Sequence, residues 1–310
     1  MRKSSAVLAT LSLAVLALTG CTAAPTYDGA SCDRTDSGHG IDQSVTVTGE
    51  VGAQPDVTIF SPLHVKETSF TDVVKGDGRA IENEQQPLTL ELSIYSGKTG
   101  KQLYATQYDP ANGQLANVSI WAQTSPGLGT VLQCATGGSR VVAALTPEDF
   151  GAKNLESFNL GKDDDVIFVI DVLDVMLAHA EGTPQFNDAQ GMPTVVRAPD
   201  GTPGVIIPDN DAPTSQVTQT LIDGEGEKLG KDQVPILNVL AVSWDDRSVI
   251  SNTWGQVPNT DLKSSNPAVA ETLVGTRVGS QVLVVTPAAK DGSATVYVVD
   301  VLGAVTPPSQ

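Results

Sequence analysis

The apolar pattern of the chain is dominated by two runs of β-branched residues, VIFVIDVLDV at 166–175 and TVYVVDVLGA at 295–304. Each run is too short to cross a membrane as a helix and too apolar for an exposed loop. Residues of this kind favour strands, so each run predicts a buried strand. Because side chains alternate along a strand, Phe168 and Asp171 point to opposite faces of the first one.

The surroundings of these two runs are also similar to each other. Phe168 matches Tyr297, and Asp171 matches Asp300. Three further pairs of segments match in the same order: 73–78 with 221–226, 88–92 with 234–238, and 126–140 with 266–281. The alternative is a chance similarity of composition. Matched turns, strands and a helical segment in one order, far longer than a solenoid repeat, favour a duplicated domain.

Short strands and Gly/Pro turns dominate both repeats, with one short helix expected in each, at 130–135 and 268–273. This pattern predicts a β-rich α+β fold. Small polar residues with Gly and Pro predict a tether before the first repeat and a linker between the two. The expected boundaries are 1–20 for a signal peptide, 21–44 for the tether, 45–178 for domain 1, 179–191 for the linker, 192–305 for domain 2 and 306–310 for a tail.

The N-terminus has the pattern of an export signal. Arg2 and Lys3 precede an apolar run at 6–18, and Leu-Thr-Gly-Cys then ends at Cys21. A charged start, a short apolar core and small residues indicate a secretory signal. The ending resembles the bacterial lipobox, which implies that Cys21 carries a lipid and anchors the protein to the membrane outside the cytoplasm. The alternatives are an ordinary signal peptide with an incidental cysteine, or an uncleaved signal anchor.

Charge and cysteine content restrict the partners and the compartment. A net charge of −18 argues against a nucleic-acid partner, which requires a basic surface. Apart from Cys21, the chain contains Cys32 and Cys134. In an exported protein this pair favours a disulfide over two free thiols. Closing a loop of roughly 100 residues would contribute about 4–5 kcal/mol in the chain-entropy model.

The second repeat resembles an FKBP-type peptidyl-prolyl isomerase domain. The family's order is a Gly-x-Gly turn, a strand leading to Phe-Asp, a helix, a Gly-x-x-x-Gly-x-Arg segment, Ile-Pro-Pro and a last apolar strand. Comparable segments occur here at 223–251, 266–287 and 295–302, and through the repeat in much of 45–175. The resemblance implies two FKBP-like domains, each an antiparallel sheet wrapped on one short helix. It also implies an isomerase for exported clients with X-Pro bonds, working without a metal or cofactor.

The resemblance further assigns prolyl-pocket positions. In the second repeat they are Asn238, Ile250, Ser251, Val269 and Tyr297; in the first they are Leu92, Tyr104, Ala105, Leu128 and Phe168. Where the family has a Tyr, a Phe-Asp pair, a Trp and a last aromatic residue, only the last is kept in kind, as Tyr297 and Phe168. Two functions therefore remain open: an isomerase of weak activity, or a non-catalytic peptide-binding or scaffold lipoprotein.

Other candidate chemistry is weaker. His39, His64 and His179 have no metal-site spacing. Asp163, Asp164 and Asp165 lack the spaced ligands of a calcium loop, so a solvated turn is expected there. No spacing indicates a Ser/His/Asp or Cys/His catalytic arrangement.

Overall fold

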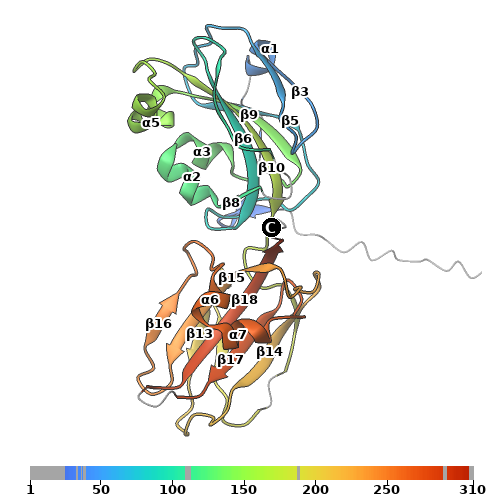
Figure 1. Ribbon diagram of the computed structural model, residues 1–310, viewed down its shortest axis with the longest axis vertical. Helices are drawn as coiled ribbons and strands as arrows, with labels where there is room; N and C mark the ends of the chain where they lie inside the picture. The colour runs from blue at the N-terminus through green and yellow to red at the C-terminus, as the bar shows by residue number, and fades with distance from the viewer. Residues whose placement is uncertain are drawn as a thin grey trace, which may run out of the picture.

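The computed structural model describes residues 25–306, except 33, 36, 38–39, 109–112, 187–188 and 289–291. These residues form two bodies, each built mainly of sheet and arranged end to end (Figure 1). The expected signal peptide, Cys21, His39 and most of the expected tail lie outside the described residues. Within the described part, no helix is long and apolar enough to cross a membrane.

The first body contains an antiparallel sheet in the order β5-β9-β10-β6-β7, with β8 also paired to β6. Its strands are β5 (Ser69–Val74), β6 (Leu88–Ser96), β7 (Gln102–Ala105), β8 (Gln114–Ala116), β9 (Ser139–Leu145) and β10 (Val166–Val175). One face packs on α2 (Val118–Thr124) and α3 (Gly127–Val131). The other face packs under α1 (Ile41–Ser44) and the hairpin of β3 (Val45–Thr48) and β4 (Asp56–Ile59). The helices α4 (Pro147–Phe150) and α5 (Ala152–Ser157) precede β10.

The second body has an antiparallel sheet in the order β11-β14-β17-β18-β15-β16. Its strands are β11 (Gly182–Pro184), β14 (Val217–Gly224), β15 (Val234–Ser243), β16 (Val249–Asn252), β17 (Gln281–Thr286) and β18 (Thr295–Val305). One face packs on α6 (Leu262–Ser265) and α7 (Pro267–Thr272). The opposite face packs on the hairpin of β12 (Thr194–Arg197) and β13 (Pro203–Ile206).

Both sheets have the same topology once the short strands β8 and β11 are set aside. Their strands lie in the sequence order first, fourth, fifth, second, third. The two runs that dominate the apolar pattern are β10 and β18, each with a strand hydrogen-bonded on either side. Both are covered by helices on one face and a hairpin on the other, which is why their side chains are apolar on both faces.

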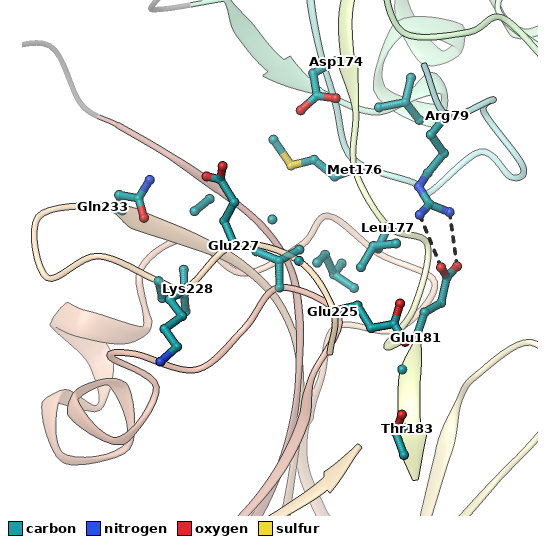
Figure 2. Close-up of a pocket in the computed structure, with 18 residues that line it drawn as sticks. Arg79, Asp174, Met176, Leu177, Glu181, Thr183, Glu225, Glu227, Lys228 and Gln233 are labelled. Atoms are coloured by element: carbon teal, nitrogen blue, oxygen red, sulfur yellow. Dashed lines mark hydrogen bonds and ion pairs between the residues drawn. The ribbon is translucent and has the colours of Figure 1, made fainter. Parts of the chain in front are cut away.

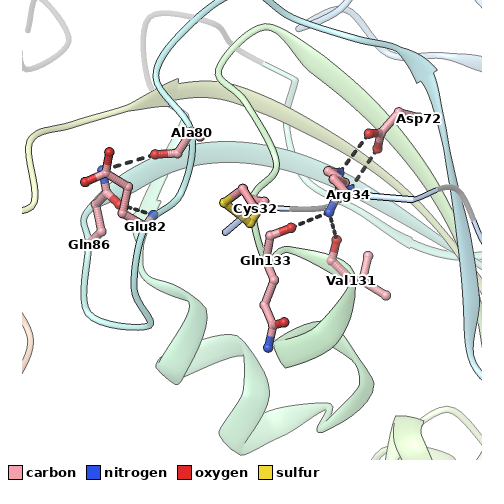
Figure 3. Close-up of a disulfide and its surroundings, with 9 residues drawn as sticks. Cys32, Arg34, Asp72, Ala80, Glu82, Gln86, Val131 and Gln133 are labelled. Atoms are coloured by element: carbon pink, nitrogen blue, oxygen red, sulfur yellow. Dashed lines mark hydrogen bonds and ion pairs between the residues drawn. A yellow bond between two sulfur atoms is a disulfide. The ribbon is translucent and has the colours of Figure 1, made fainter. Parts of the chain in front are cut away.

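The segment expected to be a tether is instead packed on the first body over its described residues. It forms the short hairpin of β1 (Thr26–Tyr27) and β2 (Ala30–Ser31) before α1 begins. Directly after β2, a disulfide joins Cys32 to Cys134, with their Cα atoms 5.7 Å apart (Figure 3). The small polar residues of this segment predict a tether. The contacts that hold it come from residues distant in sequence, so its own composition gives no sign of them.

Arg34 adds a second attachment for the same segment. Its guanidinium donates to both carboxylate oxygens of Asp72, at 2.7 and 2.8 Å (Figure 3). It also donates to the carbonyl oxygens of Val131 and Gln133, at 2.8 and 2.6 Å. The group lies 4.4 Å from the centre of the Phe70 ring. The side chain is largely buried, so these charge-assisted bonds hold the segment firmly.

The expected linker at 179–191 is likewise built into the sheet structure. Its β11 pairs with β14 of the second body. The backbone N–H of Leu177 donates to Leu302 at 3.1 Å, and that of Glu181 donates to Gly279 at 2.9 Å. The passage from one body to the other is therefore fixed by main-chain hydrogen bonds.

Candidate functional site

The matched prolyl positions must lie on the helix-facing side of each sheet if they are to form a pocket together. In the second body, Tyr297 and Val299 contact the core that includes the helix residues Leu262 and Val269. The neighbouring Val296 and Val298 belong to the core beneath the β12–β13 hairpin. Alternation along β18 thus assigns Tyr297 to the helix-facing side.

Tyr297 is tied to the start of α7. Its hydroxyl accepts a hydrogen bond from the side-chain amide of Asn266 at 2.8 Å. Asn266 also caps the helix, because its amide oxygen accepts from the backbone N–H of Val269 at 3.3 Å. The Tyr297 ring is half-buried, and Val269 is fully buried. These are the two predicted positions that the fold brings together.

Asn238 does not belong to this group. It pairs with Asp300 across β15 and β18, which places it on the hairpin-facing side with Leu240. The residues of β15 on the helix-facing side are Leu237 and Val239. The assignment of Asn238 to the prolyl pocket is therefore corrected, since a slip of one residue moves a side chain to the other face.

Ile250 and Ser251 lie on the edge strand β16. Ile250 sits at an irregularity of the pairing with β15 and is 58% exposed. Ser251 pairs with Ala241, which in turn pairs with Tyr297, so two strand spacings, about 10 Å, separate Ser251 from Tyr297. Neither residue forms a wall next to the tyrosine ring.

The corresponding place in the first body is filled. Phe168, Leu128 and Leu92 are each 1% exposed and share one core. The Phe150 ring lies 5.8 Å from Phe168 and 5.8 Å from Phe158, centre to centre. The sequence offered no sign that Phe158 would join this cluster. Aromatic side chains packed at these distances stabilise the core and leave the helix-facing side closed.

The remaining positions of the first body, Tyr104 and Ala105, lie on the edge strand β7. Tyr104 is 41% exposed, and Ala105 is half-buried. The first body therefore also fails to assemble its matched positions into one pocket.

Each sheet has a buried acidic side chain on its hairpin-facing side. In the first body, Arg140 donates to both carboxylate oxygens of Asp171 at 2.6 Å, and this bond raises the pKa of Arg140. In the second body, Gln281 replaces the arginine and donates to Asp300 at 2.8 Å. Burial raises the pKa of Asp300 to about 6, although the hydrogen bonds from Gln281 and from the backbone of Ala180 oppose this effect.

Two cavities lie at the junction of the bodies. The first junction cavity, about 680 Å³, lies along the passage at 174–177 and 181–183 and the loop at 225–229. Figure 2 shows Arg79 and Glu181 facing each other at its wall, and Lys228 on the loop of the second body. The nitrogen–oxygen distances between Arg79 and Glu181 are 3.2 and 3.3 Å. Its charged groups are of both signs.

The second junction cavity, about 690 Å³, has a different character. Its walls come from the β1–β2 turn, the loop at 82–85, the passage at 178–179 and the loops of the second body around 199–202 and 254–256. Asn238 also lines it. No pattern in the sequence predicts this cavity, because its residues come together only through the disulfide-held hairpin and the fixed junction.

Metal-ligating side chains are not clustered in the described part of the chain, where no group of three or more His, Cys, Asp or Glu is placed to hold an ion. His64 hydrogen-bonds to Asp165 at 3.0 Å instead. Asp163 is exposed, as expected for a solvated turn, but Asp164 and Asp165 are buried, which corrects the expectation for these two residues. Their carboxylates accept from loop backbone groups, Asp164 from Gly161 at 2.8 Å and Asp165 from Val65 at 3.2 Å.

Comparison with known proteins gives neighbours at the level of structure alone. No protein-family model matches the chain, and no curated protein matches it. Among solved structures, the three FKBP domains of wheat FKBP73 give a TM-score of 0.33 at 12% identity, covering 77% of this chain and 94% of that one.

Two further solved structures match part of the chain. The N-terminal domain of FKBP42 from Arabidopsis thaliana gives 0.29 at 15% identity, covering 41% of this chain and 98% of that one. A peptidyl-prolyl cis-trans isomerase from Pseudomonas syringae pv. tomato gives 0.30 at 14% identity, covering 35% and 74%. The structural neighbours are thus FKBP-type isomerases at low identity, and the function is argued from the residues.

Proposed function

We propose that the chain is a lipid-anchored, extracytoplasmic FKBP-like protein that binds exported polypeptides without accelerating prolyl isomerisation. The observation that supports this is the packing at the matched prolyl positions, where Phe150 fills the space against Phe168 and Asn266 holds the Tyr297 hydroxyl. An isomerase must take the prolyl ring into a dry apolar pocket that favours the twisted amide. In the first body, aromatic side chains already occupy that space. In the second, the hydrogen bond from Asn266 engages the one aromatic ring kept at the matched positions.

The anchoring and the location rest on the Leu-Thr-Gly-Cys ending at Cys21 of the export signal. The polypeptide clients follow from that location, because an exported anchored protein meets other exported chains before they have folded. The net charge of −18 favours protein clients over nucleic acid.

A second candidate is a membrane-anchored isomerase that assists the folding of clients with X-Pro bonds. The observation that favours it is Tyr297, which keeps an aromatic ring on the helix-facing side next to Val269. That ring is half-buried, so part of it is open to a ligand. Any activity should then depend on this one aromatic side chain.

A proline-isomerisation assay on the purified full chain separates the two candidates. We expect the rate for an X-Pro peptide to equal the uncatalysed rate, which is set by a barrier of about 18–20 kcal/mol. The Tyr297→Leu variant is the matched control and should behave in the same way. Turnover in the native chain that disappears in Tyr297→Leu would establish the isomerase and overturn the proposal.

A further inference from the structure

Apart from His179, the titratable side chains that line the second junction cavity are all acidic. Asp28 and Glu84 are exposed at one wall with Glu82 beside them, and Asp200 is exposed at the other. Neither Lys nor Arg is among the described residues that line it. Four carboxylates around one hollow attract cations, because low-dielectric walls concentrate the field of like charges.

A buried amide that opens onto this cavity indicates a ligand independently of the charge. Asn238 lies inside the sheet of the second body, is 7% exposed and lines the cavity. Its side-chain amide forms no hydrogen bond with any described residue, and its atoms are not among those that are closed off from solvent without a partner. Its donor and acceptor are therefore open to a group bound in the cavity.

Two aromatic residues next to the cavity are consistent with this. Trp254 lines it and is 8% exposed, and within the described chain its indole N–H also has no hydrogen-bond partner. Tyr27 adjoins the same wall, and burial, then Glu84, then Asp28 raise its pKa.

We propose that the second junction cavity binds a lysine- or arginine-containing segment of an exported polypeptide. The carboxylates of Glu82, Glu84, Asp28 and Asp200 bind the cationic side chains, and Asn238 binds a peptide group. An amide side chain is suited to the second role, because it donates and accepts at once, as a peptide group does. The volume lies in the range of ordinary ligand sites and holds a short stretch of chain. The assignment rests on the proposed function for the polypeptide nature of its ligand.

Fluorescence anisotropy on the full chain tests the assignment, with a fluorescein-labelled Ala-Lys-Ala-Lys-Ala peptide as probe at physiological salt. We expect the double variant Glu82→Gln/Glu84→Gln to bind the peptide about tenfold more weakly. The matched control is Glu225→Gln/Glu227→Gln, which removes the same charges at the same spacing from the first junction cavity. We expect the control to bind like the wild type.

The control also separates the cavity from the general negative charge of the protein. Equal losses in the two double variants would mean non-specific attraction and would overturn the assignment, as would no binding of the peptide. Spermidine binding as tightly as the peptide would show a site for a free polyamine and overturn the polypeptide ligand. A matched Ala-Glu-Ala-Glu-Ala peptide should not bind.

Asn238→Ala tests the amide, and we expect about a fivefold loss of affinity at an unchanged peptide preference. If this buried variant does not fold, the surface double variant decides the question alone. The isomerase assay stays separate from these outcomes. Prolyl turnover would contradict the proposed function and leave the cavity intact, whereas polypeptide binding unaffected by Glu82 and Glu84 would overturn the cavity alone.

Discussion

One substitution distinguishes the buried carboxylates of the two bodies. Asp171 is neutralised by Arg140, but Asp300 has only the neutral partner Gln281 and the backbone N–H of Ala180. Burial therefore penalises the ionised form of Asp300 and raises its pKa to about 6. A carboxyl whose pKa is higher in the folded than in the unfolded chain binds protons more tightly when folded, so stability falls as pH rises.

We accordingly expect Asp300 to lower the free energy of unfolding by about 3 kcal/mol as pH rises from about 4 to about 7, because a difference of one pKa unit between the folded and unfolded chain corresponds to about 1.4 kcal/mol. The measurement is urea denaturation at several pH values in the wild type and in Asp300→Asn. The difference between the two free energies of unfolding should change across this range and level off above it. A difference that is independent of pH would contradict the assignment.

Removing the arginine partner of the buried carboxylate in the first body gives a second prediction. Arg140→Gln copies the residue of the second body and leaves Asp171 buried without a positive partner. We expect a loss of about 3–5 kcal/mol in the free energy of unfolding at neutral pH, because an uncompensated buried charge is costly. Part of the loss comes from the missing bonds to the β3–β4 turn. A variant as stable as the wild type would contradict the prediction.

Val269 is a third residue where packing decides the outcome. It is fully buried against the sheet, so Val269→Trp, which copies the family's residue, must displace its neighbours. We expect the free energy of unfolding to fall by about 1–3 kcal/mol without a gain of isomerase activity. Ile250→Phe is the control, since its side chain is exposed and should change stability little. A stable Val269→Trp variant with new turnover would mean that the space beside Tyr297 is open.

At the scale of elements, composition and periodicity predicted the strands better than their register. The apolar runs are β10 and β18, and the helices α3 and α7 overlap the expected segments. Asn238 was nevertheless matched to Leu92. In the sheets Glu91 pairs with Asp171 as Asn238 pairs with Asp300, so Glu91 is the counterpart. The pairing shifts by a residue between Ile236 and Leu237, and an irregularity of this kind leaves no trace in hydrophobic alternation.

The covering hairpins were missed for a related reason. The strands of the β12–β13 hairpin have only four residues each, and the described part of the expected tether is small and polar. Both are ordered by contacts with the sheets. Local sequence carries no record of such contacts. The same argument explains why the sequence does not predict the second junction cavity. The acidic residues can be read from the sequence, but the contacts that bring them together cannot.

The disulfide is the testable element of this segment. Cys32 and Cys134 close a loop of 102 residues, worth about 4–5 kcal/mol in the chain-entropy model. We expect thiol labelling of the purified, non-reduced protein to find neither cysteine free. Reduction should lower the stability of the first body and weaken binding of the lysine peptide, because the β1–β2 turn forms one wall of the cavity. Two labelled thiols in the oxidised protein would disprove the pairing.

At the scale of the whole molecule, the proposed lipid anchor would determine where the two bodies are held. We expect Cys21→Ala to move the protein from the membrane fraction to the soluble fraction, since the proposed lipid attachment requires this sulfur. Detection by antibody in separated fractions measures the change, and Cys32→Ala serves as the control. A Cys21→Ala protein that remains with the membrane at the wild-type level would contradict lipidation.

With a lipid on Cys21, the disulfide-held hairpin would also limit how far the protein extends from the bilayer. Thr26 already belongs to the wall of the cavity, and five residues of fully extended chain span about 17 Å at most. A lipid on Cys21 would therefore hold the cavity at the edge of the headgroup layer, because the spacer between the lipid and the folded part of the chain is short. The cavity would then bind only polypeptides that come close to the membrane surface. Inserting residues after Cys21 to lengthen the spacer should extend the distance from the membrane at which a client can bind.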